Sequence, residues 1–236
     1  MPPVDEIRNN LKHVREAISA SAIRAGRDAS SVRLIAVSKT FPAERIAEAY
    51  ACGQRDFGEN RVQEFCEKLA QLHLPDAKFH FIGHLQSNKV SQAAAFDWID
   101  TIDSERLARR LNESALKAGK VIPVLIEVKL GEEAAKTGIA EAEVAALAAV
   151  VESLKNLALN GLMTIPPHTP DPADSRPYFR RLRELRDRLR AGGFPQLNEL
   201  SMGMTRDFPI AIEEGATMVR VGAAIFGPRA KPKAEA

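Results

Sequence analysis

Short apolar segments alternate with helical patterns along this chain, and the alternation repeats eight times within 236 residues. The apolar segments read RLIAV, DFG, KFHFIG, DWIDTI, VIPVLIEVKL, ALNGLMTI, NELSM and TMVRVG. The helical patterns that follow them begin near Pro42, Arg61, Ser87, Ser104, Ala140, Arg176, Asp207 and Ala223. Strands that alternate with helices form parallel sheets, and this many right-handed crossovers favours closure into a (β/α)₈ barrel.

An extra helix precedes this alternation. Apolar residues recur there at three- to four-residue intervals, at Val4, Ile7, Leu11, Val14 and Ile18. The spacing predicts an amphipathic helix that ends near Gly26. An open doubly wound sheet is the alternative to a barrel, but no G-x-G-x-x-G follows the first apolar segment. We therefore expect one α/β domain over residues 1–229, a TIM-type (β/α)₈ barrel with an extra N-terminal helix, and a disordered tail over 230–236.

The charge balance and hydropathy argue against several classes of partner. The chain carries 33 Lys and Arg residues against 31 Asp and Glu residues, a formal net charge of +2. This balance creates no strong field toward nucleic acid or membrane. No apolar run approaches the ~18 residues of a membrane span, and the N-terminal residues lack the apolar segment of a signal peptide. We expect a cytoplasmic protein without a membrane partner, with Cys52 and Cys66 as reduced thiols.

One segment, RPYFRRLRELRDRLR, carries seven arginines within fifteen residues. Its apolar residues Phe179, Leu182, Leu185 and Leu189 follow a helical period. Acidic residues interrupt its positive charge. We interpret the segment as an outer helix of the barrel and expect no nucleic-acid partner.

Two histidines, His80 and His84, stand four residues apart. This spacing suits a zinc ion on a helix face, whereas these two fall on a strand and at its end. We expect no metal site.

The chemistry-bearing residues follow the predicted strands. Active sites of (β/α)₈ barrels lie at the carboxyl ends of the strands, so the residues just beyond each strand are the candidates. They are Lys39, Asn60, His84, Met163, Thr164, Ser201, Thr205 and Gly222, with Arg220 on the last strand. The stretch from Pro166 to Pro177 follows the sixth strand with five prolines, and we interpret it as a barrel loop that partly covers this end.

An anion and an amine could meet at this end of the barrel. Phosphate groups often bind barrels at the loops after strands seven and eight, here SMGMT and the turn at Gly222. A short helix begins after Gly222, and its N–H groups suit an anion; the alternative is that these glycines simply end their strands. Lys39 follows the neighbouring first strand, where loss of water lowers the pKa of an ammonium group and lets the amine form a Schiff base. Phosphate beside an amine is what pyridoxal 5′-phosphate (PLP) requires, although Lys39 could equally be a solvated or ion-paired lysine.

Arg220 alternates with apolar residues in TMVRV, which points it into the barrel. A buried arginine needs a partner. That partner could be a carboxylate such as Glu199, or the pyridine nitrogen of a bound cofactor. A permanent charge beside that nitrogen would keep it unprotonated and weaken the ring as an electron sink.

The motifs together resemble a known family. LIAVSKTFP, GQRDFGENRVQEF, FHFIGHLQSNK, IDSERLA, GLMTIP and LSMGMTRDFPIAIEEGATMVRVGAAIFG are similar to the pyridoxal phosphate homeostasis protein family, which is related to the N-terminal barrel of alanine racemase. The resemblance extends from the first helix to about Gly227. It implies a bacterial, single-domain barrel that binds PLP covalently and supplies, buffers or protects the cofactor without robust turnover.

The resemblance also assigns roles to residues. It implies a Schiff base on Lys39 and phosphate contacts from Ser201, Thr205, Gly222 and Ala223. It implies further contacts from Asn60, His84, Met163 and Arg220. Two departures bear on this assignment. Ala223 replaces the Ser or Thr that often follows this glycine, so one phosphate hydroxyl is missing, and Lys129 and Leu130 stand where many members have an asparagine and a small aliphatic residue.

An amino-acid racemase related to alanine racemase is the alternative function. Racemisation needs a base on each face of the Cα–H bond. Lys39 could serve one face, but alanine racemase takes the other from a tyrosine of a second domain across a dimer. Neither Tyr50 nor Tyr178 is placed for this role. We therefore expect a monomeric carrier of PLP with PLP-dependent apo-enzymes as possible partners.

Overall fold

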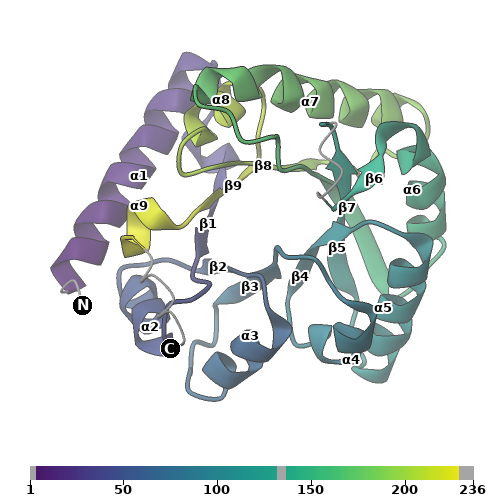
Figure 1. Cartoon of the computed structure of the whole chain (residues 1–236), viewed down its shortest axis with the longest axis horizontal. Helices are drawn as coiled ribbons and strands as arrows, with labels where there is room; N and C mark the ends of the chain where they lie inside the picture. The colour runs from purple at the N-terminus through teal and green to yellow at the C-terminus, as the bar shows by residue number, and fades with distance from the viewer. Residues whose placement is uncertain (1–3, 132–136, 229–236) are drawn as a thin grey trace, which may run out of the picture.

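Eight parallel strands close into a barrel, as the alternation predicts. The computed structural model describes residues 4–131 and 137–228, so the tail expected over 230–236 lies outside the described residues. The barrel strands are β1 (Arg33–Val37), β2 (Asp56–Glu59), β3 (Lys78–Phe81), β4 (Trp98–Ile102), β5 (Ile122–Lys129), β7 (Leu157–Met163), β8 (Glu199–Met204) and β9 (Met218–Val221). Pairing of β1 with β9 closes the ring, which Figure 1 shows end-on.

Helices surround the strands on the outside of the barrel (Figure 1). They are α1 (Val4–Arg24), α2 (Ala43–Ala51), α3 (Val62–Leu69), α4 (Val90–Ala93), α5 (Glu105–Lys117), α6 (Val144–Glu152), α7 (Arg176–Ala191), α8 (Phe208–Glu213) and α9 (Ala223–Phe226). Short 3₁₀ turns precede three of them, at Ser87–Lys89, Glu141–Glu143 and Pro172–Ser175, and a fourth, Ala29–Ser31, precedes β1. A short strand absent from the sequence-based expectation, β6 (Ile139–Ala140), pairs with the end of β5.

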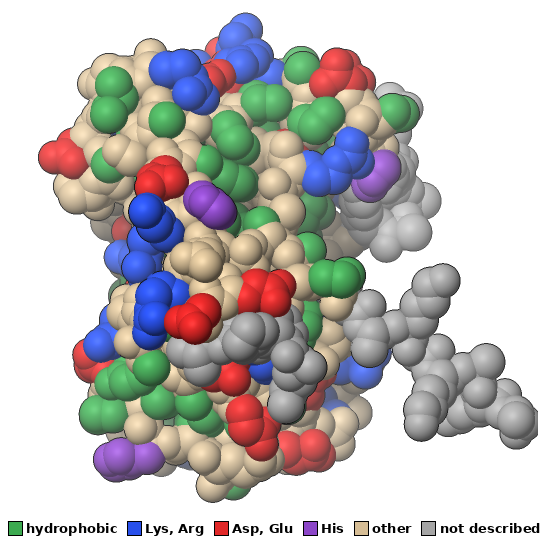
Figure 2. Space-filling view, turned by 90° about the vertical axis from the view of Figure 1, so that its left-hand side faces the viewer, with side chains coloured by type: hydrophobic (Ala, Val, Ile, Leu, Met, Phe, Trp, Pro, Cys, Tyr) green, Lys and Arg blue, Asp and Glu red, His purple; other side chains and the backbone are tan. Residues whose placement is uncertain are grey.

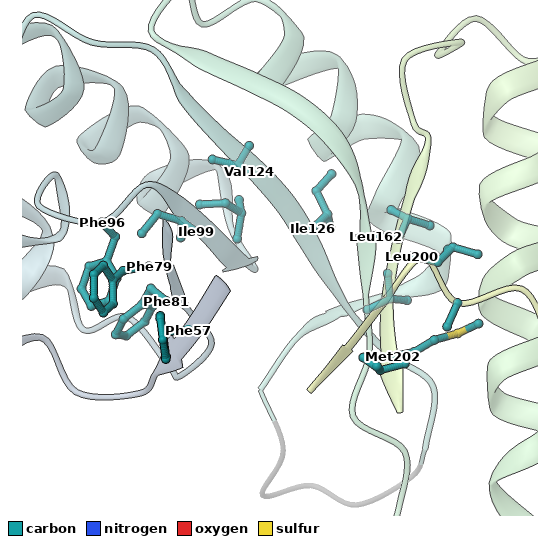
Figure 3. Packing of buried hydrophobic residues seen from close by; sticks show 14 of the residues in the cluster. Phe57, Phe79, Phe81, Phe96, Ile99, Val124, Ile126, Leu162, Leu200 and Met202 are labelled. Carbon is teal, nitrogen blue, oxygen red and sulfur yellow. The ribbon is translucent and has the colours of Figure 1, made fainter. Parts of the chain in front are cut away.

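Side chains alternate between two cores because successive strand residues point to opposite faces. The outer core lies between strands and helices. It includes a phenylalanine cluster in which the rings of Phe65 and Phe96 lie 4.0 Å apart, with Phe57, Phe79 and Phe81 beside them (Figure 3). The inner core fills the barrel axis with four fully buried residues, Ile35, Leu125, Met163 and Met218. Within the described residues, polar side chains therefore occupy only a few positions inside the barrel.

The N-terminal helix α1 packs against α8 and α9, beside the point where the barrel closes. Its apolar stripe, Ile7, Leu11, Val14 and Ile18, is buried as its spacing predicts. The side-chain amide of Asn10 donates a hydrogen bond of 3.0 Å to the carbonyl oxygen of Ile225. Helix α1 therefore covers the outer side of the last elements of the barrel.

The arginine-rich segment forms the outer helix α7. Phe179, Leu182, Leu185 and Leu189 are buried, as the sequence predicts. Six of its seven arginines pair with acidic residues, including Arg176 with Glu214 at 3.0 Å. Figure 2 shows another face of the molecule, on which Lys and Arg side chains are interspersed with Asp and Glu. Within the part of the chain that the structure describes, no helix is long and apolar enough to cross a membrane.

Candidate functional site

A cavity of about 390 Å³ opens where β1, β7, β8 and β9 end. We call it the mouth pocket. It is lined by Val37, Lys39, Ile82, Ile165, Pro166, Pro167, His168, Thr169, Pro172, Ser175, Met204, Thr205, Arg206, Asp207, Arg220, Gly222 and Ala223. The pocket thus brings together five of the nine residues to which the family resemblance assigns a role, Lys39, Thr205, Arg220, Gly222 and Ala223.

The proline-rich loop forms one wall of the mouth pocket. Residues 165–169 line it directly, as does Pro172. Arg206, from the loop after β8, donates a hydrogen bond of 2.6 Å to the carbonyl oxygen of Pro170. This tether fixes the loop over the pocket, so the loop is a wall of the site and no domain junction.

Lys39 is half-buried and lies one residue beyond Ser38, where the chain leaves β1. The next residue, Thr40, has a φ of 68°. A β-branched residue adopts this left-handed conformation only when its surroundings hold it there. The sharp turn leaves Lys39 on the wall of the mouth pocket.

Gly222 directly follows β9 and lies beside the end of β1. A Cβ atom at Gly222 would lie only 3.1 Å from the carbonyl oxygen of Val37, which explains why a side chain is absent here. The Gly222 N–H donates a hydrogen bond of 3.3 Å to the hydroxyl of Thr205. This bond joins the loop after β8 to the turn after β9, the two segments that the sequence predicts to hold an anion.

Arg220 is buried, 3% exposed, and its guanidinium is held from two sides. Nη1 donates a hydrogen bond of 2.7 Å to Ser201 Oγ, and Nη2 donates one of 2.9 Å to the carbonyl oxygen of Thr164. Glu199, the carboxylate partner considered from sequence, instead accepts a hydrogen bond from Thr217 and lies 3.7 Å from Arg33. The proposed Arg220–Glu199 pair is therefore wrong, because Arg220 lies opposite Met204 at the end of β8, whereas Glu199 is the first residue of that strand.

A chain of polar groups continues below Arg220, buried at Ser201, Asp100 and His80 and partly exposed at its last member, Asp56. Ser201 Oγ donates to Asp100 Oδ2 at 3.2 Å, and Asp100 Oδ1 lies 3.2 Å from His80 Nδ1. The other ring nitrogen of His80 lies 3.3 Å from Asp56. Burial disfavours the charged ring, but the neighbouring Asp100 and Asp56 carboxylates outweigh it and raise the pKa of His80. We call Arg220, Ser201, Asp100, His80 and Asp56 the axial chain.

The charged members of the axial chain alternate in sign, with the neutral Ser201 between Arg220 and Asp100. Burial lowers the pKa of the Arg220 guanidinium, while Asp100 exerts the largest opposing effect. A buried charge is tolerated when it is paired and hydrogen-bonded. The chain thus lets Arg220 remain a fixed cation at the base of the mouth pocket.

The structure places the other predicted residues elsewhere. Ser201 is fully buried, with its hydroxyl between Arg220 and Asp100, so its side chain lies below the pocket wall. Met163 is also fully buried, in the inner core beside Ile165. Asn60 and His84 line a separate cavity of about 620 Å³ between the β2–α3 and β3–α4 connections. His84 there lies 3.6 Å from Asp103.

The sequence motifs assign no role in the site to three members of the axial chain, Asp100, His80 and Asp56. Asp100 and Asp56 fall within predicted strands, and the spacing of His80 and His84 bears only on metal binding. For Asp100 and His80 the alternation carries a signal, because each is a polar residue at an inward position between buried outward neighbours. Among the described residues, no group of three metal-ligating side chains occurs.

Comparison with known proteins places this geometry in a family. The family described as "Alanine racemase, N-terminal domain" matches residues 4–230. The pyridoxal phosphate homeostasis protein of Vibrio alginolyticus is 45% identical over 231 residues, which cover 96% of this chain and 99% of the relative. The chain belongs to the pyridoxal phosphate homeostasis protein family. The Escherichia coli K12 member is 43% identical over 235 residues, covering 96% of this chain and 98% of the relative.

Solved structures agree with this family assignment. The protein PipY of Synechococcus elongatus, solved with PLP bound, has a TM-score of 0.83 and 41% identity. The match covers 94% of this chain and 100% of PipY. An alanine racemase of Clostridium difficile shares the fold at a TM-score of 0.74 with 16% identity, and this chain covers 56% of it. The pyridoxal phosphate homeostasis fold is thus the barrel part of that larger chain.

Proposed function

We propose that this protein binds PLP as a Schiff base on Lys39 and serves PLP homeostasis in the cell without robust catalytic turnover. The observation that carries the proposal is the convergence of Lys39, Arg220 and the Thr205–Gly222 turn on one pocket. The curated relatives are named for PLP homeostasis, and PipY was solved with PLP bound. Both facts support the same cofactor here.

The residues of the mouth pocket fit PLP by their chemistry. Lys39 supplies an amine for the aldehyde carbon, with loss of one water. The Thr205 hydroxyl and the turn at Gly222 line the pocket side by side, joined by a hydrogen bond, and would hold the phosphate. Ile82, Ile165 and the prolines provide apolar walls for an aromatic ring. Bound PLP would supply an electron sink at this place.

Arg220 favours binding over turnover. Its position is fixed by Ser201 and Thr164. An arginine keeps its proton at all ordinary pH values, so its N–H groups donate a hydrogen bond to a ring nitrogen and cannot accept one from it. A ring nitrogen that faces Arg220 stays unprotonated, and the ring then withdraws electrons weakly.

The tyrosine that the racemase alternative needs as its second base is absent from the described lining of the mouth pocket. Tyr50 donates a hydrogen bond to Asp76, which precedes β3 and therefore lies at the opposite end of the barrel from Lys39. Tyr178 lies on α7 and is not among the residues that line the mouth pocket. A carrier needs one amine and no second base. We extend the proposal to a monomeric, cytoplasmic protein that hands PLP to PLP-dependent apo-enzymes.

Two measurements on the purified protein test this function. Wild type titrated with PLP should turn yellow, and Lys39→Ala should not acquire the visible absorbance band. Incubation of the PLP-loaded wild type with L-alanine should then produce no D-alanine above a protein-free control in chiral chromatography. Sustained formation of D-alanine would contradict the carrier function and support the racemase alternative.

A further inference from the structure

Both residues that flank Lys39 are held by side chains from β2 and α3, of which Glu59 and Lys68 are buried and Glu64 is partly exposed. Ser38 Oγ donates a hydrogen bond of 2.7 Å to Glu59 Oε1, and the Ser38 carbonyl oxygen accepts one of 3.0 Å from Lys68 Nζ. On the other side, the Thr40 N–H donates a hydrogen bond of 2.6 Å to Glu64 Oε1. The turn that presents Lys39 is therefore fastened before and after it.

The three holding side chains form one ion cluster, which we call the Lys68 clamp: Glu59, Glu64 and Lys68. Lys68 Nζ lies 2.7 Å from Glu59 Oε1 and 2.7 Å from Glu64 Oε1. With the bond to Ser38, these contacts use all three ammonium hydrogens of Lys68. Lys68 is therefore a structural cation here, because all three of its N–H hydrogens are engaged in these contacts.

Stability alone is a weak reason for such a cluster. Replacing a buried ion pair by apolar residues is often neutral or stabilising, because burial removes both charges from water. The cost is visible in Glu59, which is fully buried and whose Oε2 has no hydrogen-bond partner among the described residues. Burial raises the pKa of Glu59, although Lys68 and Ser38 oppose the change.

The backbone at Thr40 shows what the clamp holds. Its φ of 68° lies in the left-handed region, which a β-branched residue disfavours. The hydrogen bond from Thr40 N–H to Glu64 stabilises this conformation. Burial raises the pKa of Glu64, but hydrogen bonds from Lys68 and Thr40 outweigh it, so the net pKa is lowered and the carboxylate stays charged.

We propose that Glu59, Glu64 and Lys68 are positioning residues that fix the direction of Lys39 in the mouth pocket before PLP arrives. This role rests on the function proposed for Lys39. A residue held in its binding geometry loses less freedom on binding, so the clamp raises the affinity of Lys39 for an aldehyde ligand. The clamp acts through the two flanking residues and touches no ligand.

Glu64 offers the sharpest test, because it is partly exposed and binds the turn through a single acceptor atom. Glu64→Ala removes the acceptor for Thr40 N–H, while Glu64→Gln keeps an oxygen in its place. Glu67→Ala is the matched control, since it removes the same charge from an exposed position of the same helix. Lys39→Ala reports separately on the proposed function.

PLP affinity and association rate are measured from the visible absorbance of each variant, and folding from circular dichroism melting without PLP. We expect Glu64→Ala to weaken PLP binding about tenfold, the effect of losing one charge-assisted hydrogen bond. Glu64→Gln should recover most of this loss, and Glu67→Ala should match wild type. Thr40→Gly combined with Glu64→Ala should also recover affinity, because glycine adopts the left-handed turn without help.

The clamp is refuted if Glu64→Ala binds PLP like Glu67→Ala, or if Glu64→Gln is as impaired as Glu64→Ala. A failure of the double variant Thr40→Gly/Glu64→Ala to bind better than Glu64→Ala would also overturn it. The proposed function fails separately if Lys39→Ala keeps the wild-type absorbance band. That result would leave the clamp without a lysine to position.

Discussion

Arg220 Nη1 donates a hydrogen bond of 2.7 Å to Ser201 Oγ, and the same hydroxyl donates to Asp100 at 3.2 Å. Ser201 therefore connects a cation at the base of the mouth pocket to a carboxylate inside the barrel. The resemblance to the family implied a phosphate contact for Ser201. We propose instead that its side chain acts on the cofactor through Arg220.

Replacing Ser201 by Ala should destabilise the fold and weaken PLP binding together. The substitution leaves one Arg220 N–H and one Asp100 oxygen buried without this partner, which costs about 1–3 kcal/mol of unfolding free energy. Urea unfolding and PLP titration measure the two effects. Ser153→Ala, at the exposed end of α6, is the control and should change unfolding by less than about 0.5 kcal/mol. Equal stability of Ser201→Ala and wild type would contradict the axial chain.

His80 should make stability depend on pH. Its pKa is raised above the ordinary value of 6.5, with Asp100 and Asp56 facing its two nitrogens. A raised pKa in the folded state contributes stability that is fully present below the unfolded pKa and is lost as pH rises through the folded pKa. The unfolding free energy of wild type should therefore fall above about pH 6.5, and the fall should be smaller in His80→Gln. If the unfolding free energies of wild type and His80→Gln, measured in urea, change with pH to the same extent, His80 carries no extra proton in the folded state.

Position 223 tests where the phosphate lies. Ala223 lines the mouth pocket and lacks the hydroxyl that the family resemblance leads us to expect after this glycine. Ala223→Thr should tighten PLP binding about two- to tenfold by adding one hydrogen bond. Ala223→Val has the same shape without the hydroxyl and should not tighten binding. Equal affinities of the two variants in PLP titrations would place the phosphate away from this turn.

The fold followed from sequence because its signals are local and repeated. Eight apolar segments with helical patterns between them indicate a barrel, and the spacing of Phe179, Leu182, Leu185 and Leu189 correctly predicts the buried face of α7. The short strand β6 was missed because two residues give no periodicity.

The site was predicted less completely, because it depends on contacts between distant residues. Position after a strand was enough to bring Lys39, Thr205 and Gly222 to one pocket. It could not show that Ser201 turns toward Asp100, or that Asn60 and His84 face another cavity. The partner of Arg220 likewise depends on the stagger of β8 against β9, which shifts irregularly between Ser201 and Met204.

The most direct test of the account is to locate the lysine that holds PLP. Wild type loaded with PLP is reduced with borohydride, which converts a Schiff base into a stable bond, and the modified peptide is identified by mass spectrometry. We predict one modified lysine, Lys39, and no reducible adduct in Lys39→Ala. A borohydride-stable adduct on another lysine of Lys39→Ala, at the occupancy seen in wild type, would contradict the central claim.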